Sequence, residues 1–117
     1  MENDYQKCTD ACKVCHDLCN REVARLIEST QPSSLGDVEI EALIRCAAMC
    51  ETAGKALDGR RSLAEIICVA CATNCEQTAV LLASHPQMAE CLRAASDCAV
   101  KCRAVASGQD RATRSLG

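Results

Sequence analysis

Four cysteines near the start of the sequence have a spacing that suits metal or redox chemistry. They are Cys8, Cys12, Cys15 and Cys19, separated by four, three and four residues. On an α-helix this spacing places all four side chains on one stripe, which normally holds leucine, isoleucine or valine. Thiolates bind soft metal ions and carry out redox reactions. The stretch therefore predicts a helix that directs such thiols into the interior of a bundle.

Eight further cysteines lie at related helical spacings later in the chain. They form three groups: Cys46 and Cys50; Cys68, Cys71 and Cys75; Cys91, Cys98 and Cys102. Twelve cysteines in 117 residues is a density typical of secreted disulfide scaffolds. The first residues have no apolar signal core, however, and we expect no later stretch to reach transmembrane length. We therefore predict a cytoplasmic protein with reduced thiols and no membrane partner.

The remaining composition argues against one class of partner. The formal net charge is −3, from 13 basic and 16 acidic residues, and Tyr5 is the single aromatic residue. Single-stranded nucleic acids are usually held by basic grooves with aromatic stacking platforms, and double-stranded ones by basic patches. The sequence has neither feature, so we predict no nucleic-acid partner.

Apolar periodicity and loop signals define the predicted helices in the first half of the chain. The first helix covers residues 3–28 and the second covers residues 37–58. The connection between them, residues 29–36, is rich in serine and contains proline and glycine, which is typical of a loop.

Cap signals define the two helices of the second half. Ser62 with Glu65 is a predicted capping box for the third helix, which ends near residue 83. Ser84 is the predicted N-cap of the fourth helix, with Gln87 three residues later and Pro86 in its first turn. The fourth helix is expected to end near residue 106.

The connections between the helices determine the expected fold class. No segment alternates with the period of a β-strand, and the connections are short enough to make neighbouring helices antiparallel. We predict an all-α fold, an antiparallel up-down-up-down four-helix bundle with a cysteine-lined core. This bundle comprises residues 1–106, and residues 107–117 form a polar C-terminal tail.

Matching the four helical seams in this topology stacks the thiols into a column. At about 1.5 Å per residue, the column is roughly 16 Å long from Cys8 to Cys19. The expected layers are Cys8, Ala53, Cys68 and Cys102; Cys12, Cys50, Cys71 and Cys98; Cys15, Cys46, Cys75 and Ala95; and Cys19, Leu43, Thr78 and Cys91. All twelve cysteines are thus predicted to be buried.

The geometry of a helical thiol column selects among thiol chemistries. Residues at i and i+4 hold their β-carbons about 5–6 Å apart, which is too far for a disulfide. Zinc requires closed sites of four ligands, and only the layer of Cys12, Cys50, Cys71 and Cys98 is expected to complete one without sharing. Neither His16 nor His85 follows a glutamate by three residues, so a carboxylate di-iron site is excluded.

Cu(I) suits the column best, because it is soft and accepts two or three thiolates. Each ion also neutralises buried thiolate charge and displaces thiol protons. The expected capacity is on the order of six ions per chain at two thiolates per ion, and more if thiolates bridge. A thiol-based redox protein, a zinc or other soft-metal binder, and cysteines that serve only in packing remain alternatives.

The sequence resembles the bacterial four-helix-bundle copper storage proteins in three features. These are the cysteine stripe of residues 8–19, the later cysteine pairs and triplets, and the segment from His85 through Met88 to Cys91. The resemblance covers most of residues 3–106. It implies a cytosolic, non-enzymatic protein that stores Cu(I) on cysteines inside the bundle and assembles as a homotetramer. It also implies a metal entrance at the end marked by His85 and Met88. We expect that crystals of the protein can form without the metal bound.

Overall fold

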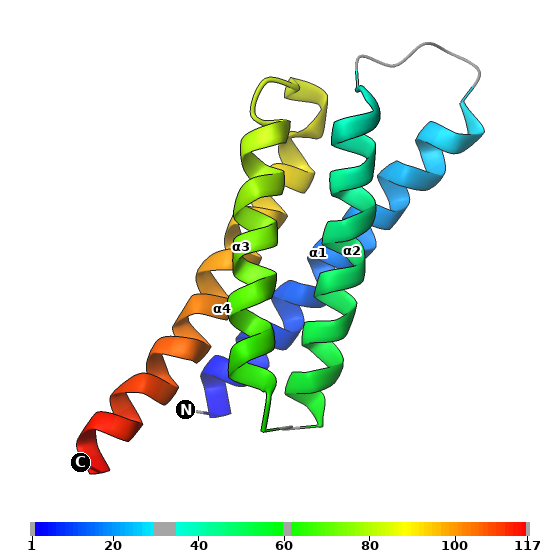
Figure 1. Ribbon diagram of the computed structural model, residues 1–117. Helices are drawn as coiled ribbons and strands as arrows, with labels where there is room; N and C mark the ends of the chain where they lie inside the picture. Colours follow the sequence, from blue (N-terminus) through cyan, green and yellow to red (C-terminus); the bar gives the residue numbers. More distant parts are fainter. Residues whose placement is uncertain (1, 30–34, 60–61, 117) are drawn as a thin grey trace.

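The four predicted helices are present in the structure, a computed structural model that describes residues 2–29, 35–59 and 62–116. They are α1 (Glu2–Glu28), α2 (Asp37–Asp58), α3 (Ala64–Leu82) and α4 (Ala89–Leu116), and a short 3₁₀ turn, η1 (Pro86–Met88), precedes α4. The described ranges contain no β-strand. In Figure 1, α1 and α3 run toward one end of the bundle, and α2 and α4 return toward the other. The predicted all-α four-helix bundle is confirmed.

The helix starts differ from those predicted at two places. Ser62 lies in a turn and α3 begins at Ala64, without a side-chain cap. The carboxylate of Glu65 does not complete a capping box with Ser62, because it accepts a hydrogen bond from the Tyr5 hydroxyl of α1. A contact between helices has replaced a local signal, so the predicted capping box is wrong.

The start of the fourth helix is also corrected. Ser84 does not cap it, because the chain forms the turn η1 first, where the backbone N–H of Met88 donates to the His85 carbonyl at 2.8 Å. Pro86 occupies the first turn as predicted, since it lacks the N–H that a helix start leaves unpaired. At its other end α4 continues past residue 106 to Leu116, extending beyond the neighbouring helices (Figure 1). The division between bundle and tail stays a prediction.

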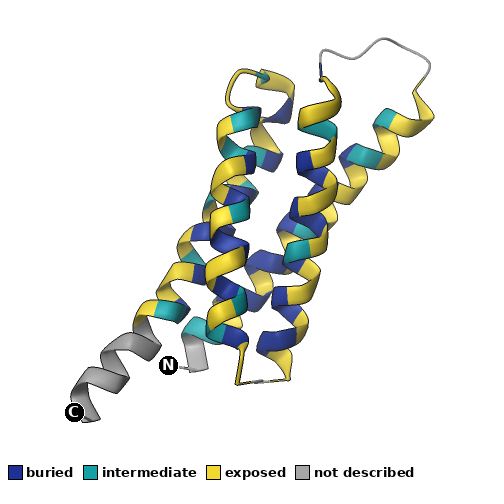
Figure 2. Ribbon diagram, viewed as in Figure 1, coloured by how far each residue is buried: buried dark blue, intermediate teal, exposed yellow. Residues whose placement is uncertain are grey.

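The core consists of small side chains and thiols from all four helices. Their buried faces line the bundle axis, while the outward faces are exposed (Figure 2). The four residues predicted to occupy column positions in place of cysteine are all 2% exposed or less: Leu43, Ala53, Thr78 and Ala95. A few larger apolar side chains, such as Leu43 and Leu82, are fully buried with them. The seams that organise the fold are therefore those predicted from spacing.

Helix α3 corrects the expectation that no stretch of the chain reaches transmembrane length. Its 19 residues have a mean hydropathy of 1.2, so by length and composition alone it is apolar enough to cross a bilayer. The core helix of a bundle passes the same test, and α3 directs Cys68, Cys71 and Cys75 into the core. The hydropathy of this single helix is therefore weak support for a membrane span.

Two neighbouring residues of α2 test the contribution of the apolar core. We expect Leu43→Ala to destabilise the reduced, metal-free protein by about 2–5 kcal/mol, because Leu43 is fully buried and truncation leaves a cavity. Ile44→Ala is the matched control and should change stability by about 0.5 kcal/mol or less, since Ile44 is 51% exposed. Urea unfolding followed by circular dichroism measures both, and equal losses would contradict the core assignment.

Candidate metal centre

All twelve cysteines are free and buried, and most of them contact a thiol from another helix. The Sγ atoms of Cys8 and Cys102 are 3.4 Å apart, joining α1 to α4. The Sγ atom of Cys15 is 3.6 Å from that of Cys46, joining α1 to α2. The Sγ atoms of Cys46 and Cys75 are 3.7 Å apart, joining α2 to α3. The helical stripe of the sequence has therefore become one wall of a thiol column, as predicted.

Two groups of four thiols share no member. In each group all Sγ atoms lie within 4.8 Å of one another, and all the residues are buried. The groups are Cys12, Cys71, Cys98 and Cys102, and Cys15, Cys46, Cys50 and Cys75. The expectation that only one four-thiol site could form without sharing is therefore wrong.

The difference arises from the position of Cys50. It was expected level with Cys12, yet its Sγ atom is 3.8 Å from both Cys75 and Cys98. Packed helices interdigitate at staggered heights, so a residue contacts the layers above and below it. Cys50 thus belongs to the second group and also to a third, which overlaps the first two: Cys50, Cys71, Cys75 and Cys98.

The ends of the column contain fewer thiols. At one end Cys8, Cys68 and Cys102 form a group of three, which confirms the contacts predicted for that layer. At the other end Cys19 and Cys91 are buried but join no group of three or more thiols among the described residues. The Cys91 thiol instead donates to the Leu18 carbonyl at 3.6 Å. Thiol density is therefore greatest in the middle of the column.

The contacts between thiols shift their pKa values in opposite directions. Hydrogen bonds from Cys102 and then Cys12 lower the pKa of Cys98, because donated S–H groups stabilise its thiolate. Contacts with Cys15 and then Cys46 raise the pKa of Cys50, and burial raises it further. The thiols of the column thus act as hydrogen-bond donors and acceptors to one another. A cation that binds as a thiolate complex here displaces thiol protons.

The structure places His85 and Met88 together at the turn before α4. Met88 is 2% exposed and belongs to the buried core. The His85 Nε2 atom lies 3.4 Å from the Glu39 carboxylate, and both side chains are mostly buried. Glu39 also accepts a hydrogen bond from the Gly36 backbone at the start of α2. Sequence reasoning did not identify this Glu39 contact, and the role of His85 and Met88 in metal binding stays a prediction.

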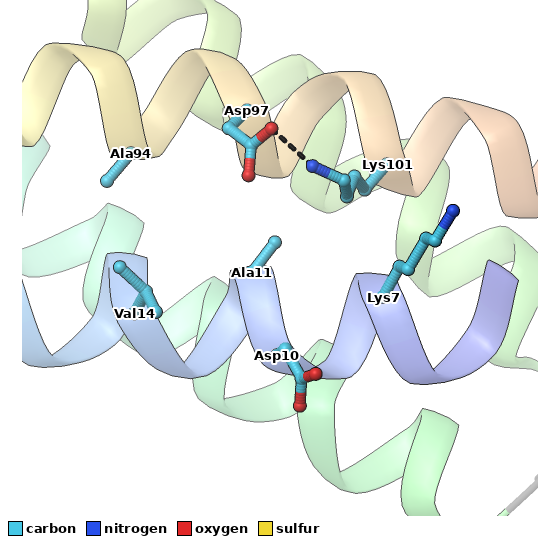
Figure 3. A pocket seen from close by; sticks show the side chains of 7 residues that line it. All are labelled: Lys7, Asp10, Ala11, Val14, Ala94, Asp97 and Lys101. Carbon is cyan, nitrogen blue, oxygen red and sulfur yellow. Dashed lines mark hydrogen bonds and ion pairs between the residues drawn. The ribbon is translucent and has the colours of Figure 1, made fainter. Parts of the chain in front are cut away.

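Surface pockets differ in whether they reach the thiols. A pocket of about 270 Å³ between α1 and α4 is lined by two alanines, Val14 and charged side chains, and its lining contains no cysteine. Figure 3 shows Asp97 paired with Lys101 above this pocket and Ala11 pointing into it. A second pocket, of about 210 Å³ between α1 and α2, has Cys12 and Cys50 in its lining. Sequence reasoning found neither pocket, because neither follows from helical spacing alone.

Comparison with known proteins matches the chain to one family. The family model described as copper storage protein matches residues 1–111. A curated relative, the uncharacterized cysteine-rich protein YhjQ of Bacillus subtilis, is 29% identical over 110 residues, which cover 92% of this chain and all of the relative. The solved structure of the Cu(I)-bound copper storage protein BsCsp3 has a TM-score of 0.80 at 28% identity, covering 88% of this chain and 98% of that one.

Two further solved structures are similar. Apo copper storage protein 3 from Bacillus subtilis has a TM-score of 0.70 at 26% identity, covering 86% of this chain and 97% of that chain. The Nmul_A1745 protein from Nitrosospira multiformis has a TM-score of 0.85 at 23% identity, covering 92% of this chain and 98% of the other. At this identity the likeness supports the bundle fold.

Zinc is a suitable probe of the two separate four-thiol groups. We expect the wild-type protein to bind two tight zinc equivalents per chain, because tetrahedral thiolate sites suit zinc. Cys50→Ala should bind one, since it removes a member of the second group and leaves the first intact. Cys19→Ala is the matched control and should still bind two. Anaerobic titration against a chromophoric chelator measures these values, and two equivalents in Cys50→Ala would contradict the grouping.

Proposed function

Because the chain belongs to the copper storage protein family, we propose that it stores copper as several Cu(I) ions on the buried thiolates of its core. The observation that carries this proposal is the continuity of the column. Overlapping groups extend from Cys8 to Cys46 with every sulfur buried. A single catalytic or regulatory site would need only one such group. The likeness to the Cu(I)-bound structure supports the same function.

The geometry of neighbouring thiols suits the coordination preferences of Cu(I). The ion needs only two or three soft ligands, and contacts of 3.4 to 3.8 Å between sulfurs occur along the column. Each bound ion also places a positive charge among thiolates that would otherwise be unneutralised in a low-dielectric core. Two thiolates per ion correspond to a capacity of about six ions, and bridging sulfurs increase it.

The ligand residues of this proposal are the twelve cysteines, supported at one end by His85 and Met88. The protein binds and releases its cargo without turnover, in line with a storage family. It acts in the cytoplasm, because sulfurs in such close contact stay reduced only where thiol reductants are abundant. Apart from copper, its partners are further copies of the same chain, and it requires neither nucleic acid nor membrane.

Zinc is a second candidate cargo, favoured by one specific observation. At a Zn–S distance of about 2.3 Å, the sulfurs of a tetrahedral site lie about 3.8 Å apart. The distances from Cys46 to Cys15 and to Cys75 are 3.6 and 3.7 Å, close to this value. Zinc would occupy two four-thiol sites and leave the ends of the column empty, so its capacity would be lower than that of Cu(I).

Exposed apolar residues on α3 support assembly as a homotetramer. Ile66, Val69 and Val80 are 67%, 42% and 75% exposed. Their spacings of three and eleven residues place them on one side of the helix, facing away from the thiols. An apolar stripe of this kind is typical of a subunit interface. A second copy of the chain is the proposed occupant of this surface.

Copper capacity tests the storage function. We expect anaerobic titration with a competing chelator to give at least several tight Cu(I) equivalents per chain. Ala53→Cys should raise this number, because Ala53 is fully buried at a column position. Ala48→Cys, exposed on the same helix, is the matched control and should not raise it. Saturation near one ion, or equal gains in both variants, would contradict storage in the column.

Charge on the apolar stripe of α3 tests the assembly. We expect the wild-type protein to be tetrameric by light scattering coupled to size-exclusion chromatography. The double variant Ile66→Lys with Val80→Lys should shift it to smaller species, because lysines desolvated at an interface are unfavourable. Thr52→Lys, exposed on α2 and away from the stripe of α3, serves as the control. A monomeric wild-type protein would refute the tetramer.

A further inference from the structure

The pocket between α1 and α2 gives a path from the surface to the middle of the thiol column. Its volume is about 210 Å³. Its lining combines two cysteines with polar and charged residues: Cys12, Lys13, His16, Cys50, Glu51, Gly54, Lys55 and Asp58. Cys12 and Cys50 are 0% and 1% exposed, so they lie at its base, whereas Glu51 and Lys55 are exposed at its rim.

Gly54 keeps this pocket open. It is buried within α2, where glycine is less favourable than alanine by about 0.5–1 kcal/mol. A β-carbon at this position would lie 3.8 Å from the Cys12 β-carbon, which is an ordinary contact. Packing therefore does not require glycine here. The missing side chain leaves space directly above Cys12.

The side pocket differs from the ends of the column in the chemistry that it offers to an ion. Leu82, the last residue of α3, is fully buried toward one end. Leu57, near the last turn of α2, is 2% exposed toward the other. These side chains offer no ligand atom, whereas the lining of the pocket includes two thiols and the imidazole of His16.

The base of the pocket is also the best connected part of the column. Cys98 lies 3.6 Å from Cys12 and 3.8 Å from Cys50, measured between Sγ atoms. Cys50 lies a further 3.8 Å from Cys75. An ion bound by Cys12 or Cys50 can therefore reach either of the two separate four-thiol groups by exchanging a single ligand.

We propose that this pocket is a side entrance through which Cu(I) reaches Cys12 and Cys50 before the thiols at the ends of the column. This inference rests on the proposed storage function and specifies where its cargo arrives. His16 at the rim is the first ligand offered to the ion. Its Nε2 atom lies 2.9 Å from the Asn20 amide and 3.9 Å from Glu51, both replaceable partners near the surface. The two lysines and two acidic residues of the lining balance in charge, so ligand chemistry rather than charge selects what enters.

The transfer itself is a ligand exchange without change of oxidation state. A donor complex with two small thiolates on Cu(I) enters the pocket, and Cys12 or Cys50 replaces the first donor thiolate. Cys98 replaces the second. Each cysteine passes its thiol proton to the departing thiolate, so two donor thiols leave and the copper remains Cu(I).

Thiol labelling of the metal-free protein tests the entrance independently of copper binding. A substoichiometric amount of methyl methanethiolsulfonate is added under anaerobic conditions, and the modified peptides are identified by mass spectrometry. We expect Cys12 and Cys50 to be labelled before Cys19 and Cys91. Gly54→Leu should reduce labelling of Cys12 and Cys50 about tenfold by filling the pocket, an effect equal to about 1.4 kcal/mol in barrier. Labelling of Cys19 and Cys91 should be unchanged.

Copper uptake gives the second measurement. Transfer from a coloured Cu(I) chelator, followed by stopped-flow absorbance, should be about tenfold slower in Gly54→Leu, with the same final number of ions. Ala48→Leu, exposed on the same helix, is the matched control and should load at the wild-type rate. If Gly54→Leu fails to fold, Gly54→Ala replaces it, because its β-carbon is accommodated.

Two results would overturn the side entrance. One is labelling of Cys19 or Cys91 before Cys12 and Cys50 in the wild-type protein. The other is wild-type loading by a folded Gly54 variant whose side chain fills the pocket. Absence of Cu(I) binding by the wild-type protein would refute storage, while the order of labelling would still report whether the pocket is open.

Discussion

The burial of twelve thiols in one core is the constraint on which the rest of the structure depends. A thiolate in a low-dielectric interior is unfavourable unless a cation or a hydrogen-bond donor compensates its charge. In the metal-free protein, S–H groups of neighbouring cysteines provide this compensation, which explains why the pKa values of Cys98 and Cys50 shift in opposite directions. A soft monovalent cation replaces those protons and neutralises the charge that they leave. Metal binding and core stability are therefore coupled in this fold.

The stagger of the helices turns a stack of layers into overlapping groups. If the thiols were arranged in level layers, each ion would be confined to its own site. The position of Cys50 between Cys75 and Cys98 connects neighbouring groups, so an ion can move by exchanging one ligand at a time. This continuity explains how a buried store can fill and empty without unfolding. It also gives a physical role to a pocket that opens onto the middle of the column.

The sequence allowed the seams and the fold to be predicted, because helical spacing determines which residues share a face. It correctly placed Leu43 and Ala53 in the core and Cys8 beside Cys68 and Cys102. It did not predict the position of Cys50 along the bundle axis, because the stagger between neighbouring helices depends on how whole helices pack. The predicted capping box at Ser62 is wrong because the Glu65 carboxylate accepts a hydrogen bond from Tyr5, which is distant in sequence. The pocket at Gly54 was not anticipated because it depends on a missing side chain at a contact between two helices.

The location of copper in the loaded protein is the most direct test of the central claim. Crystals of the Cu(I)-loaded protein, measured at the copper absorption edge, give an anomalous difference map that shows each ion. The thiol column predicts several peaks along the bundle axis, each within bonding distance of two or three Sγ atoms between Cys8 and Cys19. Copper found only at surface side chains such as His16, with the thiols unligated in a fully loaded sample, would contradict the account.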